Sequence, residues 1–193
     1  MENVARLYTR LNGQTRNEII ECFKSLGYVV EAKVVCASDY GVPQNRYRVL
    51  FIGKKTDDNN YEIAFPAKSN KPAPTIKDAI GKYPALESGE SSDIVNHEAM
   101  VHSQQMIEKM SYVKDGGSRD DIPVEIRPQK VDIRKYIRYD STKPSICITG
   151  DMRKVFHYSQ NRALTVRELA AIQTYPDSFV FLGSKILQQQ MVG

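Results

Sequence analysis

Hydrophobic positions recur with a helical period near the start of the chain. Between residues 14 and 26, Ile19, Phe23 and Leu26 follow one another at spacings of three and four residues, and Gly27 comes next. This spacing places the apolar side chains on one face, and a glycine is a common stop signal after a helix. The pattern predicts an amphipathic helix over 14–26.

The pattern then changes to runs typical of strands. Residues 28–36 and 46–53 are rich in β-branched and aromatic side chains, and Gly41 and Pro43 between them mark a turn. We therefore expect helix, strand, loop, strand. This order is typical of the edge of an α/β layer.

Regular periodicity is rare from residue 55 to about 155. This stretch is proline-rich, and its one good helix candidate is 98–110. Such a segment predicts a small domain of loops and short strands inserted between more regular parts. After it, Thr165 and Glu168 form a capping-box pattern that starts a helix, which we expect to end at Pro176.

Composition narrows the class of protein. The 193 residues are 41% hydrophobic and 26% charged, with a formal net charge of +4. The longest apolar runs are far too short for a membrane span, and the N-terminus lacks the apolar core of a secretory signal, so we expect a cytoplasmic protein. The three cysteines, Cys22, Cys36 and Cys147, lack C-x-x-C spacing, so we expect buried reduced thiols and no metal site.

One polar pattern enters the second strand. Gln44, Arg46 and Arg48 alternate, which places all three side chains on one face of a strand. Two guanidinium groups on one face are costly to bury without acceptors. A solvated edge strand with incidental arginines is the alternative reading.

These residues belong to a longer pattern that resembles a known family. The segment 41–48 reads Gly-x-Pro-Gln-x-Arg-x-Arg, Glu2-Asn3-Val4 precedes it, and 162–179 and 190–193 follow it. They resemble, in order, motifs VIII, VI, IX and the start of X of the bacterial DNA cytosine-5 methyltransferases. The resemblance covers nearly the whole chain and is most specific in motifs VIII and IX.

The resemblance implies a restriction-modification methyltransferase that uses S-adenosylmethionine and methylates C5 of a cytosine flipped out of double-stranded DNA. Glu2 is then the partner of the base at N3, Arg48 the donor to O2, and Arg46 lines the same pocket. Such groups stabilise charge where it develops on the ring. A solvated terminal acid is the alternative reading of Glu2.

The resemblance also places DNA contacts in the middle of the chain, where basic residues cluster. Phosphate contacts would offset the cost of flipping the base. The family has a threonine at the DNA backbone here, for which we expect Thr149, with Cys147 as the other candidate position. A solvated charged face is the alternative. The expected DNA-binding residues are Gln44, Arg127, Lys130, Arg134, Lys135, Arg138, Thr149 and Arg153.

The family's cofactor glycines and Pro-Cys nucleophile precede motif VI and have no counterpart here. We therefore expect the C-terminal part of the enzyme, inactive and a poor binder of S-adenosylmethionine by itself. One alternative is a subunit of a split methyltransferase, and the other is a non-catalytic, sequence-specific DNA-binding module. Removing half of a sheet exposes a strand edge, which predicts self-association as well as pairing with the missing half.

The expected fold is α/β: the remnant of a Rossmann-like methyltransferase sheet plus an irregular target-recognition domain. Residues 1–54 would belong to the catalytic domain, 55–155 to the recognition domain, and 156–193 would return to the catalytic domain. Arg162 and Arg167 in the last part are expected to be structural.

Overall fold

The computed structural model describes residues 1–58 and 60–193. The chain divides into two compact units. Unit 1 comprises Met1–Gly41 and Asn45–Pro72, and unit 2 comprises Val42–Gln44 and Ala73–Gly193. The short segment Val42–Gln44 therefore belongs to unit 2 although unit 1 residues flank it in the sequence.

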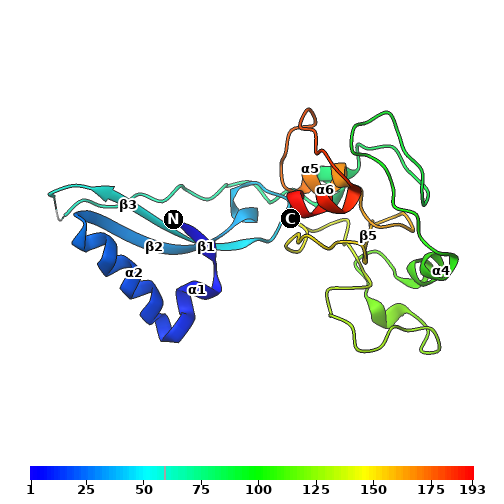
Figure 1. Cartoon of the computed structure of the whole chain (residues 1–193), viewed down its shortest axis with the longest axis horizontal. Coiled ribbons are helices and arrows are strands. Elements are labelled where there is room, and N and C mark those ends of the chain that lie inside the picture. The colour runs from blue at the N-terminus through cyan, green and yellow to red at the C-terminus, as the bar shows by residue number, and fades with distance from the viewer. Residues whose placement is uncertain (59) are drawn as a thin grey trace. The chain divides into compact units, whose positions relative to one another are not determined.

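Unit 1 is built on a three-stranded sheet (Figure 1). Its strands are β1 (Glu2–Val4), β2 (Tyr28–Cys36) and β3 (Tyr47–Lys55), in the order β1-β3-β2. Both outer strands run antiparallel to β3. The two predicted strands are thus confirmed, and β1 adds the segment that resembles motif VI.

Helix α2 (Gln14–Ser25) covers one face of this sheet (Figure 1). Its Phe23 ring meets the Tyr28 ring edge-on at 5.9 Å. Gly27 has a φ of +82°, a conformation in which glycine avoids the Cβ clash of other residues, so it ends the helix as predicted. The shorter helices of unit 1 are α1 (Arg6–Thr9), η1 (Arg10–Gly13) and η2 (Ala37–Tyr40).

Unit 2 consists mainly of loops around short elements. The helices are α3 (Ile76–Ile80), α4 (Gln104–Tyr112), η3 (Arg119–Asp121), α5 (Val166–Ile172) and α6 (Lys185–Val192). Strands β4 (Ile137–Arg138) and β5 (Val155–Phe156) pair in parallel. The main core packs α3 against α5, with Ile76, Leu169 and Ile172 fully buried.

The start of α5 follows the predicted capping box. The Thr165 hydroxyl accepts a bond from Glu168 N, and the Glu168 carboxylate accepts one from Thr165 N. These bonds satisfy main-chain donors that the first helical turn leaves open. The helix ends at Ile172, before the predicted stop at Pro176, and Thr174 adopts a left-handed φ of 63°.

Two expectations need correction. The helix predicted over 98–110 begins only at Gln104, because the Ser103 hydroxyl caps it and Glu98 instead pairs with Ser91 in a β-bridge. All three cysteines are reduced, but Cys22 is exposed on α2 and Cys147 is half-buried, so only Cys36 is buried as expected.

The expected domain boundaries at residues 54 and 155 stay a prediction, and the two compact units have other bounds. Residues 156–193 pack with 73–155 in unit 2, through α5 and α6, and unit 1 extends past residue 54 to Pro72. A return of 156–193 to the catalytic domain stays a prediction. Among residues 1–58 and 60–193, no helix is long and apolar enough to cross a membrane.

Candidate functional site

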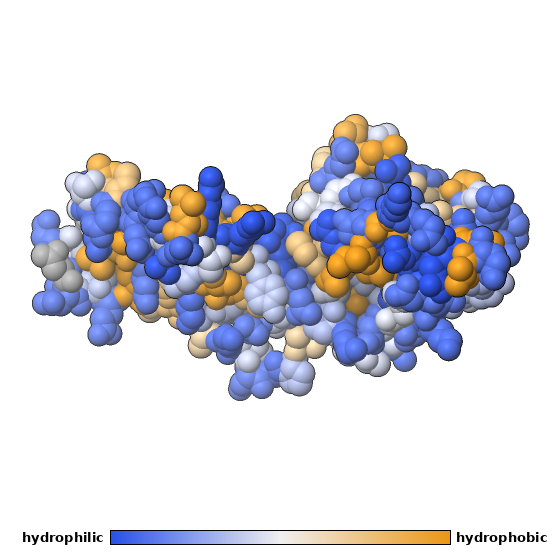
Figure 2. Space-filling view, turned by 90° about the horizontal axis from the view of Figure 1, so that it is seen from below, coloured by the Kyte–Doolittle hydropathy of each residue, from blue (hydrophilic) through white to orange (hydrophobic). Residues whose placement is uncertain are grey.

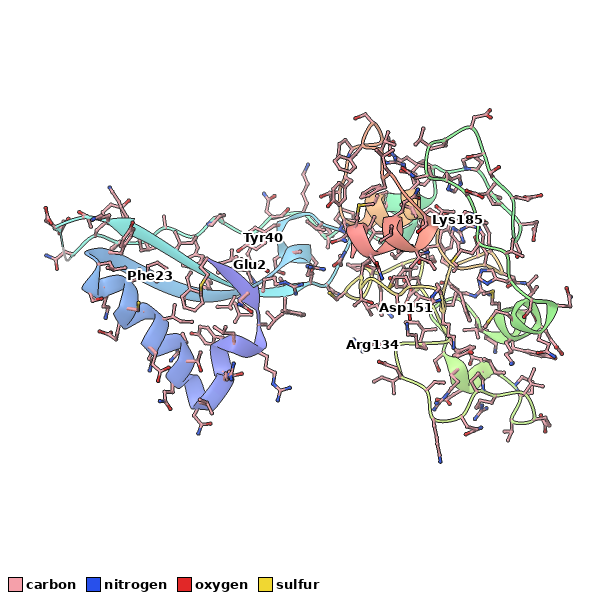
Figure 3. All side chains as sticks on the ribbon, in the orientation of Figure 1. Glu2, Phe23, Tyr40, Arg134, Asp151 and Lys185 are labelled. Atoms are coloured by element: carbon pink, nitrogen blue, oxygen red, sulfur yellow. The ribbon has the colours of Figure 1, made fainter. Side chains whose placement is uncertain are left out.

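Glu2 and Arg48 meet on the sheet of unit 1. Val4 lies opposite Arg48 and Glu2 opposite Leu50, which places both charged side chains on the same face. Arg48 Nε lies 2.8 Å from Glu2 Oε1. The Glu2 side chain is 56% exposed and that of Arg48 22%, so the pair lies open to a ligand (Glu2 is labelled in Figure 3).

Two contacts hold the Arg48 guanidinium in place, and they occupy only some of its N–H donors. Its Nη1 donates to Tyr47 O at 2.8 Å, in addition to the contact of Nε with Glu2. A guanidinium has five N–H donors, so Arg48 can hold both partners and still donate to the oxygen of a bound molecule. The two residues form a carboxylate and a planar cation at one place, which suits recognition of a polar ring.

The other two residues of the alternating pattern lie in different surroundings. Arg46 is half-buried just before β3, where its carbonyl accepts a bond from Ala37 N. Gln44 belongs to unit 2 and is 1% exposed. Its main chain forms a parallel bridge with Ser145, and Ser145 N donates to Pro43 O. A side chain this deeply buried does not reach a DNA surface, so we assign Gln44 to the support of the loop.

Most of the predicted DNA-binding residues lie in segment 126–154 of unit 2. This segment has eight lysines and arginines and three aspartates. The aspartates hold several of the cations: Asp132 binds Arg134 at 2.6 Å, and Asp151 binds Lys135 at 2.8 Å and Arg153 at 2.9 Å. Arg134 and Asp151 are labelled in Figure 3. The remaining excess of positive charge suits a polyanion.

These ion pairs also lower the pKa values of the two aspartates. Hydrogen bonds from Arg134 hold the pKa of Asp132 far below its usual range, and bonds from Arg153 and Lys135 do the same for Asp151. Both aspartates are solvent-exposed, so the pairs order side chains and add little stability.

The prediction that Arg138 contacts DNA is wrong. It is 6% exposed, and its five donors all bond within unit 2. Nε bonds Val113 O, Nη1 bonds the carbonyls of His157 and Gln160, and Nη2 bonds Met110 O and Asn161 Oδ1. No donor remains for a phosphate, and burial lowers the pKa of this side chain.

Arg127 also has a structural role, because Nε and Nη2 bond the carbonyls of Ile122 and Asp120. Lys130 and Thr149 are exposed. Thr149 lines a small cavity of about 50 Å³ together with Cys147 and Lys135. The structure therefore brings Lys135, Thr149 and Asp151 together and leaves Lys130, Arg134 and Arg153 accessible.

Unit 2 also has a buried ionic cluster that the sequence patterns did not predict. Arg162 and Glu168 form a bidentate pair at 2.6 and 2.8 Å, and His157 Nε2 lies 3.7 Å from the same carboxylate. Burial lowers the pKa of His157 to about 4. Burial alone would raise the pKa of Glu168, but the bonds and charge of Arg162 lower it. The capping-box pattern signalled Glu168 only as a cap.

Arg162 and Arg167 are buried, as expected for structural residues. Arg167 donates to the carbonyls of Val95, Pro176 and Phe179 and so holds loops on both sides of α5. Within the described ranges, no group of three or more His, Cys, Asp or Glu side chains is arranged to hold a metal ion.

Comparison with known proteins shows what these elements belong to. A model of the C-5 cytosine-specific DNA methylases matches residues 1–193. The chain belongs to this family. The chain is 63% identical over 193 residues to Type II methyltransferase M1.HphI of Haemophilus parahaemolyticus. It is 29% identical over 203 aligned residues to Type II methyltransferase M.BbvI of Brevibacillus brevis.

Both matches take in 100% of this chain but 51% and 52% of the two relatives, so the chain spans about half the length of the curated relatives it matches. Solved structures agree on the fold. A prophage-encoded E. coli protein described as a DNA modification methyltransferase superposes with a TM-score of 0.73 at 22% identity, covering 100% of this chain and 63% of that one. Spodoptera frugiperda DNMT2 gives 0.59 at 15%, covering 100% and 60%.

The family uses S-adenosylmethionine, and the described residues do not fit this group. S-adenosylmethionine contains a nucleoside, and Rossmann-like folds bind nucleoside-bearing cofactors where a strand leads through a glycine-rich turn into a helix. Among the residues that the structure describes, β1 is the one strand that leads directly into an α-helix. Its link to α1 is Ala5, with no glycine there and no acidic residue in the first turn of α1. We assign the cofactor no residue in this part of the chain.

Proposed function

We propose that this chain carries the base pocket and the DNA-reading half of a Type II DNA cytosine-5 methyltransferase. The whole enzyme would transfer a methyl group from S-adenosylmethionine to C5 of a flipped cytosine. The observation that carries the proposal is the Glu2–Arg48 pair, 2.8 Å apart on adjacent strands and partly open to solvent. Membership of the family supplies the reaction to which such a pair is suited.

The pair matches the charge that develops on the base. Carbon 5 of cytosine is a poor nucleophile, and attack of a thiolate on C6 moves electron density toward N3 and O2. We place Glu2 at N3 and Arg48 at O2, with Arg46 lining the pocket. Because the two strands fix both groups before the base arrives, little reorganisation is needed during the reaction.

The thiolate and the cofactor site would come from outside these 193 residues. None of Cys22, Cys36 and Cys147 follows a proline, and none precedes Glu2 as the family's nucleophile does. We propose that the chain is inactive alone and works with an N-terminal half, on the same polypeptide or on a partner subunit.

Unit 2 would hold the DNA while the base is flipped. Flipping costs a few kcal/mol of stacking and pairing, which phosphate contacts help to offset. The accessible contacts that we propose are Lys130, Arg134, Lys135, Thr149 and Arg153. Asp132 and Asp151 keep three of these cations in place until phosphates replace the carboxylates.

A complementation assay tests the proposal. Transfer of labelled methyl groups to duplex DNA is measured with this chain, with the N-terminal half of M1.HphI, and with both. We expect no incorporation with either alone and incorporation with the mixture. Turnover by the isolated chain would refute the need for a second half.

A non-catalytic DNA-binding module is the second candidate. It is favoured by one observation: unit 2 has its own buried core and the basic segment 126–154, independently of the pocket residues. Salt-dependent, sequence-selective binding that no N-terminal half converts into methyl transfer would favour this function.

A further inference from the structure

The first helix of unit 1 presents two arginines that the fold leaves available. Arg6 begins α1 and Arg10 is its C-terminal cap, and both side chains are exposed. Within residues 1–58 and 60–193, neither guanidinium has a hydrogen-bond or ion-pair partner. Arg16 on α2 differs, because its guanidinium lies over the Tyr8 ring at 4.5 Å and bonds Asn17 Oδ1. Arg6 and Arg10 are therefore free to bind a ligand.

The glutamates near these arginines in the sequence have other partners. Residues 1–20 contain Glu2 and Glu18. Glu2 pairs with Arg48 at 2.8 Å, and Glu18 accepts a bond from Gln14 Nε2 at 2.7 Å. The positive charge on α1 is thus not neutralised locally, and such a site attracts an anion.

Both arginines line one hollow of unit 1, about 370 Å³ in volume. Its other lining residues are Asn3, Val4 and Leu7. Asn3 Oδ1 accepts a bond from Val4 N at 2.8 Å, which leaves the amide N–H groups of Asn3 as donors. Guanidinium groups bind phosphate through paired N–H donors, and the two apolar side chains suit a sugar. The lining therefore fits the sugar-phosphate part of a nucleotide.

The backbone directly after Arg10 is strained. Leu11 and Asn12 have left-handed φ values of 50° and 53°, and Gly13 follows at 88°. A leucine adopts this region only at a cost, and strain of this kind gathers at binding sites. The turn ends α1 at Arg10 and leads into α2. It thereby keeps Arg10 at the hollow that Arg6 lines.

The hollow borders the base pocket proposed above. Glu2 and Val4 point to the same face of β1, and Val4 lies opposite Arg48 in the register of the sheet. A flipped base stays joined through its sugar to two phosphates, so a phosphate site belongs beside a site for the base. This position favours a DNA phosphate over a carboxylate of a protein partner.

We propose that Arg6 and Arg10 clamp one phosphate of the DNA strand that carries the flipped cytosine. The clamp rests on the proposed function, which places the base at Glu2 and Arg48. It gives unit 1 a backbone contact of its own, separate from the cations of unit 2. A contact beside the pocket holds the nucleotide while its base is out of the stack.

The salt dependence of DNA binding tests the clamp, because it counts phosphate contacts. Binding of the whole chain to a fluorescent duplex is measured by anisotropy at several salt concentrations. Each contact contributes about 0.9 to the slope of log K against log salt concentration. We expect Arg6→Gln/Arg10→Gln to lower the slope by about 1 and the affinity at low salt by about tenfold. Arg6→Lys/Arg10→Lys should keep the slope, because the charges remain.

A matched control removes two exposed cations elsewhere in unit 1. Lys24 pairs with Glu21 on α2, and Lys54 lies opposite Val29 toward the end of β3. Lys24→Gln/Lys54→Gln changes the net charge by the same amount as the glutamine variant of the clamp. Its slope should equal that of the unaltered chain. An equal fall in both double variants would show an effect of net charge and would overturn the clamp.

The complemented enzyme gives a second readout. A contact made equally before and during the reaction lowers KM without raising kcat. With the N-terminal half of M1.HphI present, Arg6→Gln/Arg10→Gln should raise KM for DNA about tenfold and leave kcat within a few-fold. A fall in kcat with KM unchanged would contradict a phosphate contact.

The remaining outcomes separate the clamp from the proposed function. Methyl transfer by the mixture, with equal slopes for the unaltered chain and Arg6→Gln/Arg10→Gln, overturns the clamp alone. Absence of both methyl transfer and salt-dependent binding overturns the proposed function and the clamp with it. A variant that keeps the slope but no longer associates with the N-terminal half in sedimentation identifies a protein contact, and the clamp is wrong. Loss of folding in the glutamine variant would show that the fold uses these arginines, which also overturns the clamp.

Discussion

The two units differ in how much hydrophobic surface they bury. In unit 1, Cys36, Val49 and Phe51 are the buried hydrophobic residues among those described, and Val4, Leu11 and Leu26 are each more than half exposed. Unit 2 has two separate buried clusters. Figure 2 shows hydrophobic surface among the hydrophilic surface of unit 1, on the left. Unit 2 therefore has the core expected of an independent domain, whereas unit 1 leaves several large hydrophobic side chains exposed to solvent.

The arginines of the two units also differ in how deeply they are buried and in how many of their donors the fold occupies. Arg48 in unit 1 has donors left for a ligand, while Arg138 and Arg162 in unit 2 are buried and their guanidinium groups bond carbonyl and carboxylate oxygens of the fold. A guanidinium thus serves binding or architecture according to which of its donors the fold occupies. Substitutions in each unit should separate these two roles.

The largest effect is expected in the core of unit 2. Glu168→Ala leaves Arg162 buried and unpaired, which should cost about 3–5 kcal/mol of unfolding free energy. Urea denaturation followed by circular dichroism measures it. Glu98→Ala is the control, because it removes an exposed pair with Lys185 and should cost about 1 kcal/mol or less. Equal losses would show that burial of the Arg162–Glu168 pair does not matter.

In unit 1 a conservative substitution should lower the rate of methyl transfer without changing DNA affinity. Arg48→Lys keeps a positive charge but loses the planar donors, so we expect kcat of the complemented enzyme to fall about 10²–10³-fold with DNA affinity unchanged. Arg16→Lys on α2 is the control and should leave kcat unchanged. A kcat within a few-fold of the unaltered enzyme would remove Arg48 from the O2 position.

Acid should destabilise unit 2 through His157. Its folded pKa, about 4, lies below the ordinary value of 6.5, so the unfolded chain binds more protons between these values. Stability is therefore complete above about pH 6.5 and falls as the pH drops toward 4, by up to roughly 3 kcal/mol for such a shift. In unfolding experiments at several pH values, His157→Gln should flatten this slope between pH 4 and 6.5. An unchanged slope would assign the acid sensitivity to other groups.

The smallest effect concerns the exposed edge of unit 1. We expect the chain to self-associate through β1, where Val4 is 54% exposed, and Val4→Lys should shift sedimentation velocity toward the monomer. Val101→Lys, in unit 2, should not. A chain that is strictly monomeric at high concentration would contradict self-association through this edge.

Sequence patterns predicted the long helix and the two long strands of unit 1 because periodicity within one segment determines each of these elements. The helix over 14–26 and both long strands follow from periodicity, whereas the shared face of Glu2 and Arg48 comes from the pairing of β1 with β3, which no local pattern predicts. The predicted helix start at residue 98 is wrong. Periodicity does not show that the helix begins later, where the Ser103 hydroxyl caps it.

Long-range contacts explain most of what the sequence did not reveal. Arg138 lies in a basic cluster in the sequence, yet the carbonyls that bury it come from residues 110, 113, 157 and 160. Gln44 belongs to a motif of unit 1 but is buried in unit 2 against Ser145. No local pattern distinguishes a cation that faces DNA from one that the fold surrounds.

The most direct test of the base pocket is Glu2→Gln in the complemented enzyme. Glu31→Gln, on an exposed position of β2, is the matched control for loss of one carboxylate from the same sheet. We predict that initial rates of methyl transfer fall about 100-fold or more for Glu2→Gln, with DNA affinity unchanged, and stay the same for Glu31→Gln. Equal rates for the two variants would contradict the placement of Glu2 at N3 of the flipped cytosine.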